Sequence, residues 1–165
     1  MGFFDKAKHF MGGHGVKVEI VKIERQAPSE ARMPMTDTVV KGTCRIVTEK
    51  DCNVLAHTFE FVVKHKNKEG VDTEQVIARD RHDEKDDIIG GNIKWPYDLP
   101  ANTPIEDYFS MHMNENIPTV LRNLGYTNPV EAINNGTVKF FLRATADVKG
   151  SPFDPKGEHE LTIVP

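Results

Sequence analysis

The 165-residue sequence has only two cysteines, Cys44 and Cys52, and neither lies near a second cysteine or a histidine pair at zinc-binding spacing. The two thiols could pair only if neighbouring strands brought them together. No apolar run is long enough to cross a bilayer, and no apolar segment typical of a signal peptide is seen. These absences argue against a zinc-stabilised or membrane-spanning protein, and we expect a cytoplasmic chain with reduced thiols.

Positive charge is also scarce, since the formal net charge is -4. A dedicated nucleic-acid binder normally carries a basic stripe, so we expect no nucleic-acid partner. Catalytic motifs are missing as well: there is no G-x-S-x-G, and the "GGHG" run follows a predicted helix instead of opening one after a strand. We therefore expect no enzyme activity, no catalytic residues and no cofactor.

The sequence does contain alternating apolar and polar residues, which predict half-buried strands. The clearest predicted strand is "TVKFFLRATADVKG", where every second residue from Val138 to Val148 is apolar or small. Further strands are predicted from Val16, within 39–50, within 56–66, over 72–80, over 92–100 and over 158–164. The segment 25–38 is predicted as a loop with some character of an edge strand. About six to eight strands separated by polar turns predict an antiparallel β-sandwich of the immunoglobulin or arrestin-like type.

Short helices are expected at three places. The apolar residues of "MGFFDKAKHFMGG" recur at helical spacing and predict an amphipathic helix over residues 1–13, placed before a single sandwich domain over 14–165. "NIPTVLRNLGY" begins with a capping Asn116 and ends at Gly125, and "TNPVEAINNG" adds one further helical turn. The amphipathic helix is expected to dock on its own sandwich, on a second subunit or partner, or on a membrane.

One loop is densely charged. We interpret "RDRHDEKDDIIGG" (79–91) as a solvated loop. Its carboxylates are weak candidates for Ca²⁺ ligands, because the spacing lacks the D-x-D-x-D-G rhythm and basic residues alternate with them. The candidates are Asp80, Asp83, Asp86 and Asp87.

Aromatic residues supply the candidate interaction residues. Trp95 and Tyr97 lie in the proline-bearing segment "NIKWPYDLP", which is expected at a sheet edge. Phe3, Phe4 and Phe10 lie on the apolar face of the predicted N-terminal helix. Trp95 is also interpreted as a core residue.

Several segments together resemble a known family. "MGFFDKAKHFMG…VKVEI", "IKWPYDLPANTPI", "VKFFLRATADVKG" and "SPFDPKGEHELTIV" resemble, in this order, the arrestin-like sporulation-control family of bacteria. The resemblance implies an arrestin-like β-sandwich and a non-catalytic role in regulation or scaffolding, and it implies no catalytic residues. Members of that family are longer, with a second arrestin-like domain, and the helix within 116–126 is an insertion relative to them.

Two functions follow from these observations. The first is a protein-interaction module that binds an extended partner segment, or a second copy of itself, at a sheet edge formed by 72–80 or 92–100. The alternative is a C2-like sandwich that binds a membrane in a Ca²⁺- or lipid-dependent way, through the loop 80–87 and the apolar N-terminus.

Overall fold

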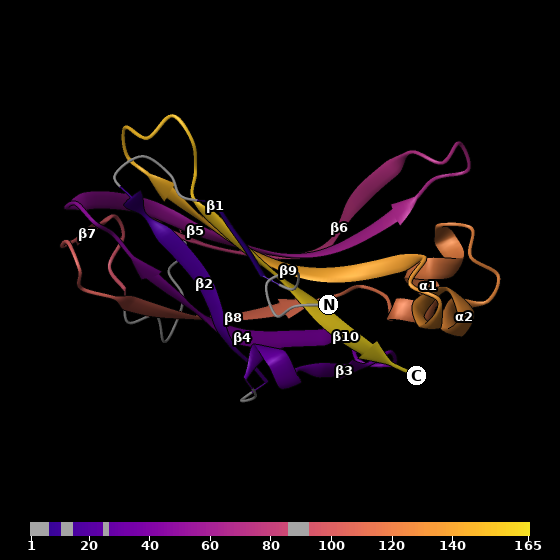
Figure 1. The fold of residues 1–165 in the computed structure, drawn as a ribbon. Coiled ribbons are helices and arrows are strands. Elements are labelled where there is room, and N and C mark those ends of the chain that lie inside the picture. The colour runs from indigo at the N-terminus through magenta and orange to yellow at the C-terminus, as the bar shows by residue number, and fades with distance from the viewer. Residues whose placement is uncertain (1–6, 11–14, 25–26, 86–92) are drawn as a thin grey trace.

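The computed structural model describes residues 15–24, 27–85 and 93–165, and the backbone of residues 7–10. Within these ranges, strands make up two facing sheets and two short helices lie at one end (Figure 1). The strands are β1 (Ala7–Phe10), β2 (Lys17–Ile23), β3 (Arg32–Pro34), β4 (Val39–Val47), β5 (Cys52–Lys66), β6 (Asp72–Asp83), β7 (Tyr97–Leu99), β8 (Ile105–His112), β9 (Val138–Val148) and β10 (Lys156–Val164). The predicted all-β sandwich with short inserted helices is confirmed.

The larger sheet has seven strands. Its main order is β1-β10-β9-β5-β6, with β3 added parallel to β10 and β7 added antiparallel to β5. The long strand β5 is the centre of this sheet, because it pairs with β9 along one edge and with β6 and then β7 along the other. The strands predicted within 56–66 and over 72–80 therefore form an antiparallel hairpin.

The smaller sheet contains β2, β4 and β8, in that order. It closes against the larger sheet along both of its edges. On the β2 side, a Cβ atom on Gly157 of β10 would lie 2.2 Å from the carbonyl oxygen of Val18, so the two backbones touch. On the β8 side, the backbone N–H of Ser110 donates to Asp80 Oδ2 of β6 at 3.2 Å.

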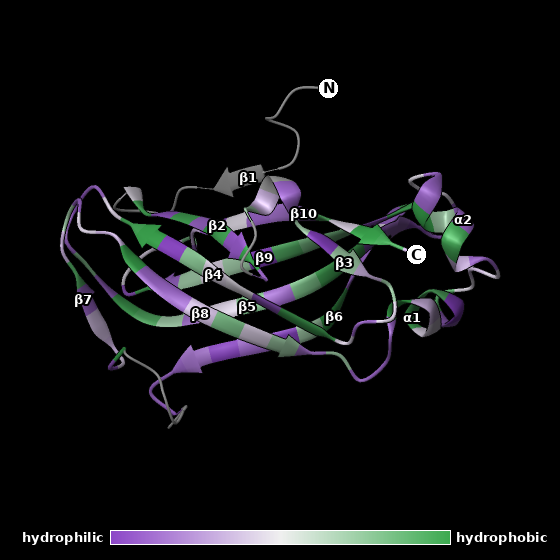
Figure 2. Cartoon of the chain, turned by 90° about the horizontal axis from the view of Figure 1, so that it is seen from below, coloured by the Kyte–Doolittle hydropathy of each residue, from purple (hydrophilic) through white to green (hydrophobic). Residues whose placement is uncertain are grey.

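The core lies between the two sheets. The strands alternate between hydrophobic and hydrophilic residues, as Figure 2 shows, and the hydrophobic ones face the opposite sheet. Phe59 of the larger sheet stacks on Phe109 of the smaller sheet, with ring centroids 4.7 Å apart. The alternation within 39–50 puts Val40, Cys44 and Ile46 on one face of the predicted strand, and all three are buried.

Two helices follow β8. α1 (Ile117–Asn123) is capped by Asn116, whose side chain accepts a hydrogen bond from the N–H of Thr119. α2 (Pro129–Asn134) is capped in the same way by Asn128. Both were expected, and neither helix is long and apolar enough to cross a membrane.

The predicted N-terminal helix is wrong where the structure describes it. Ala7–Phe10 form strand β1, which pairs antiparallel with β10, and the other residues of 1–13 lie outside the described ranges. The physical reason is that a short isolated helix is marginal in water, whereas the edge of β10 offers a complete row of backbone partners.

Three further differences concern the strands. The charged segment 79–91 begins as strand and not as loop, because β6 continues to Asp83 with partners on β5. The predicted loop 25–38 contains the three-residue strand β3. The strand β8 was not predicted, since Asp107 interrupts the apolar row formed by Ile105, Phe109 and Met111.

Candidate interaction surface

The long edge strand β6 is the candidate functional site. Along its whole length β6 pairs with β5, and of the strands described none pairs with its opposite edge. The first four residues of β6, from Asp72 to Gln75, are all exposed. Figure 1 shows the turn end of the β5–β6 hairpin extending away from the smaller sheet. An unpaired strand edge is a template for another strand.

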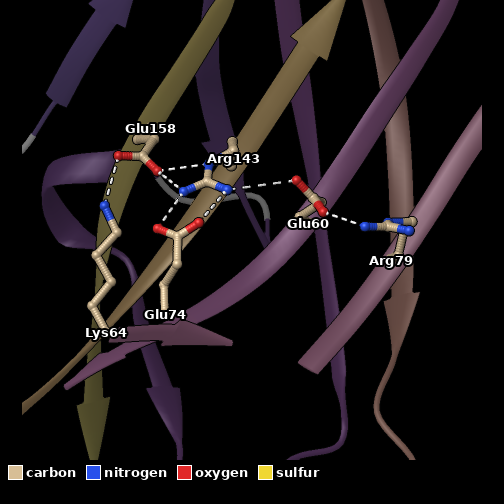
Figure 3. A network of polar contacts seen from close by, with 6 residues as sticks. All are labelled: Glu60, Lys64, Glu74, Arg79, Arg143 and Glu158. Atoms are coloured by element: carbon tan, nitrogen blue, oxygen red, sulfur yellow. Dashed lines mark hydrogen bonds and ion pairs between the residues drawn. The ribbon is translucent and has the colours of Figure 1, made fainter. Parts of the chain in front are cut away.

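A network of charged side chains fixes β6 on the outer face of the larger sheet (Figure 3). Arg143 of β9 is its centre. Its guanidinium donates to both carboxylate oxygens of Glu74, at 3.0 and 2.9 Å, and to Glu158 Oε2 at 2.7 Å. Lys64 also bonds Glu158, at 2.9 Å. This network connects β6 to β5, β9 and β10, although it lies on an outward face.

The network continues to the second half of β6. Glu60 of β5 lies 3.7 Å from Arg143 and accepts a hydrogen bond from Arg79 at 2.7 Å. Hydrogen bonds from Arg143 lower the pKa of Glu74. Burial opposes ionisation of Glu158, but hydrogen bonds from Lys64 and Arg143 outweigh it and lower the pKa of this carboxyl group. Glu74 and Glu158 therefore remain charged well below neutral pH.

A second polar network holds β6 from the inner side. Asp107 of β8 accepts hydrogen bonds on Oδ2 from His57 of β5 and from His82 of β6, both at 2.7 Å. His82 also donates to Asp80 at 3.1 Å, and Tyr97 donates its hydroxyl hydrogen to His57 Nε2 at 2.6 Å. Every ring nitrogen of these two histidines thus has a partner.

The two histidines differ in charge. Burial lowers the pKa of His57, which is 1% exposed, so its ring is neutral with the proton on Nδ1. Burial also disfavours the charged form of His82, but hydrogen bonds to Asp107 and Asp80 prevail and raise its pKa to about 10. His82 is therefore an imidazolium between two carboxylates. Hydrogen bonds from both histidines lower the pKa of Asp107 against the effect of its burial.

The inner network has a structural role. A neutral His57, a charged His82 and two carboxylates satisfy one another in the space between the sheets, and no buried side-chain polar atom of the described residues lacks a hydrogen-bond partner. The Cys44 thiol is also buried, and burial raises its pKa, so it is not poised to act as a nucleophile. What the arrangement provides is a strand held rigidly on both faces with one edge open.

The predicted aromatic interaction residues lie elsewhere. Trp95 packs edge-on against the ring of His57, with centroids 4.6 Å apart, and Tyr97 bonds the same histidine, so both serve the interior. Phe10 belongs to β1, whose side chains lie outside the described part. Phe3 and Phe4 lie outside the described residues altogether, and their proposed role stays a prediction.

Of the four candidate Ca²⁺ ligands, the two that the structure describes, Asp80 and Asp83, bond different partners. Asp80 points inward to His82 and to the N–H of Ser110. Asp83 accepts hydrogen bonds from Arg81 and from the N–H of Lys85. Asp86 and Asp87 lie outside the described residues. Among the described residues, no group of three or more potential metal ligands occurs.

Three residues of the site were missed by sequence reasoning: Asp107, His82 and Arg143. A carboxylate in an otherwise apolar row was the available signal for Asp107. His82 and Arg143 were assigned to a loop and to an outward face, and their partners come from strands distant in the sequence.

Comparison with known proteins places the chain by its fold. No protein-family model and no curated protein matches it. Among solved structures, it is similar to the crystal structure of Spo0M, a sporulation control protein from Bacillus subtilis, with a TM-score of 0.56 and 11% sequence identity. The match covers 100% of this chain and 51% of that one, so this chain spans about half the length of Spo0M. At this identity the similarity shows that the chain has the arrestin-like β-sandwich fold, and the resemblance noted in the sequence is confirmed at that level.

Proposed function

We propose that this chain is a non-catalytic regulatory module that binds an extended protein segment at the free edge of β6. The observation that supports it is the open edge of a 12-residue strand whose two faces are both fixed by polar networks. An extended segment that adds to such an edge gains a row of backbone hydrogen bonds without reordering the strand.

The other sheet edges support this choice by contrast. The β2 edge of the smaller sheet lies against β10, and on the β8 edge the N–H of Ser110 is already bonded to Asp80 of β6. The strands β3 and β7 have three residues each and β1 has four, which is too short for a stable added strand. β6 is therefore the edge of the described structure best suited to strand addition.

A regulatory role agrees with what is known of the structural neighbour, which is a sporulation control protein. The absence of an available nucleophile in the inner network favours a non-catalytic role. Both cysteines are free thiols, which fits action in the cytoplasm.

Site-specific photo-crosslinking tests the proposal. A photoreactive residue replaces Gln75, in the exposed part of β6, and a matched control replaces Thr162, an exposed residue of β10. In cells that make the protein at its native level, we expect a protein adduct from position 75 and none from position 162. The proposal is contradicted by no adduct at position 75, or by equal adducts at both positions.

A further inference from the structure

We propose that the segment bound at the edge of β6 is β6 of a second copy of this chain, paired antiparallel about a two-fold axis at Val76. This inference rests on the proposed function and names its partner. It is argued from the charges along β6 and from an irregularity in the strand.

The outer face of β6 is acidic in its first half and carries Arg79 and Arg81 in its second half, followed by Asp83, which accepts a hydrogen bond from Arg81 Nε at 2.8 Å. Four charged residues of β6 lie on this face, as their partners on β5 show. In the first half, Asp72 bonds Lys66 and Glu74 lies opposite Lys64. In the second half, Arg79 bonds Glu60 and Arg81 bonds Thr58. Their side chains retain free surface, with exposed fractions of 86% for Asp72, 47% for Glu74, 60% for Arg79 and 48% for Arg81.

A bulge places both halves on the same face. In the β5–β6 ladder, Val62 lies opposite Val76 but Phe61 lies opposite Ala78, so Ile77 is an extra residue. Asp72 and Arg81 are nine positions apart (81 − 72), an odd number, so in a regular strand without a bulge they would point to opposite faces. With it, the outer row consists of Asp72, Glu74, Val76, Arg79, Arg81 and Asp83.

This row is complementary to itself when it is reversed. If Val76 faces Val76 of the second copy, then Glu74 faces Arg79 and Asp72 faces Arg81, and the symmetry repeats each pair. The apolar pair lies at the axis with two opposite-charge pairs on each side of it, an arrangement that stabilises paired strands. Since Arg79 already bonds Glu60 and Glu74 already bonds Arg143, the outer ion network of one copy would continue into that of the other.

Other alignments lose part of this complementarity. A shift of two ladder positions in one direction keeps Glu74 opposite Arg81 but brings Asp72 opposite Asp83. The same shift in the other direction keeps Asp72 opposite Arg79 but brings Glu74 opposite Val76 and leaves Arg81 without a residue of the partner strand opposite it. A shift of one position sets outer residues opposite inner ones. Parallel pairing in register brings like charges together, which is unfavourable. The charge pattern therefore favours one orientation and one register.

A charge exchange tests the pairing. The variants Asp72→Arg and Arg81→Asp each create two like-charge pairs with their own copies, whereas a mixture of the two restores opposite charges at both positions. By analytical ultracentrifugation over a wide concentration range, we expect wild-type dimers that weaken with salt. Each variant alone should dimerise about tenfold or more weakly, and the equimolar mixture should recover the wild-type affinity. The double variant Asp72→Arg/Arg81→Asp restores opposite charges within one chain type, so it should also dimerise. Its thermal melting curve shows whether the exchanged residues still allow the chain to fold.

A cysteine at the axis gives an independent measurement. Opposed residues of antiparallel strands have Cα atoms about 4.5–5.5 Å apart, which suits a disulfide. We expect Val76→Cys to form a covalent dimer on mild oxidation, and the matched control Val71→Cys, which is exposed just before β6, not to do so. The wild-type chain, oxidised in the same way, shows whether the native cysteines form covalent dimers by themselves.

The outcomes separate this inference from the proposed function. A wild-type chain that stays monomeric at all concentrations, or a mixture that does not recover association, overturns the self-pairing. If Gln75 then crosslinks only to a different protein, the edge still functions in binding. If no adduct forms there either, the proposed function falls as well.

Discussion

His57 and His82 lie opposite each other in the β5–β6 ladder and hydrogen-bond to the same carboxylate oxygen of Asp107, each at 2.7 Å. One ring is neutral and the other is charged, because burial dominates for His57 and two carboxylates dominate for His82. This single oxygen joins β5 and β6 of the larger sheet to β8 of the smaller sheet. The stability of the sandwich should therefore depend on the protonation of His82.

The first prediction concerns pH. The pKa of His82 is raised from 6.5 to about 10 on folding. Its contribution to stability is fully present below pH 6.5 and is lost as the pH rises through 10. We expect the free energy of unfolding of the wild type, relative to His82→Gln, to decrease over this window in urea titrations. A flat difference for His82→Gln would contradict the prediction.

The second prediction assigns Tyr97 to the interior. Its hydroxyl group is the donor to the buried Nε2 of His57, so Tyr97→Phe leaves that nitrogen without a partner. We expect a loss of about 1–3 kcal/mol in the free energy of unfolding, with association unchanged. Tyr108→Phe, at a 58% exposed tyrosine, should change stability by less than about 0.5 kcal/mol. Lost association with unchanged stability would instead restore Tyr97 as an interaction residue.

The third prediction compares two arginines of the outer network. Arg143→Met leaves Glu158, which is only 6% exposed, with Lys64 as its remaining cationic partner, and we expect a loss of about 3 kcal/mol. Arg79→Met removes a partner of Glu60 that is 60% exposed, and should cost about 0–1 kcal/mol. Chemical denaturation of both variants measures the two losses in the free energy of unfolding. Equal losses would contradict the prediction, because they would mean that Glu158 is no more shielded from water than Glu60.

The fourth prediction concerns the contact between the sheets at Gly157. A methyl group there would meet the carbonyl oxygen of Val18, which is backbone and cannot rotate away. We expect Gly157→Ala to destabilise the chain by about 2–3 kcal/mol or more, measured by thermal unfolding. Thr162→Ala in the same strand, at an exposed position, should be nearly neutral. A neutral Gly157→Ala would mean that the sheets separate easily along this edge.

Local pattern was enough to predict most of the fold. The alternation within β9 and β5, the cap at Asn116 and the helical turn within 127–136 all act over a few residues, and each appears in the structure as expected. The prediction for β1 was wrong because its apolar residues also fit a helix. Pairing with the edge of β10 favours the strand over the helix.

The candidate site could not be predicted in the same way. Asp107 belongs to a strand whose pattern it disrupts, and its partner His57 is 50 positions away. Arg143 and Glu74 are 69 positions apart and become neighbours only through the order of β9, β5 and β6. Strand order is not encoded in periodicity, so sequence reasoning identified β6 as an edge but not what holds it.

The position of β10 has a consequence for how the chain folds. β10 pairs with β1 and with β3, and the pair Ala7–His159 spans 152 positions (159 − 7) of the sequence. Closing such long loops is entropically unfavourable until much of the sheet exists, so folding should begin in the local β5–β6 hairpin and end with β10. Until then β1 and β3 have no strand to pair with, and a partly folded chain exposes their edges to other molecules.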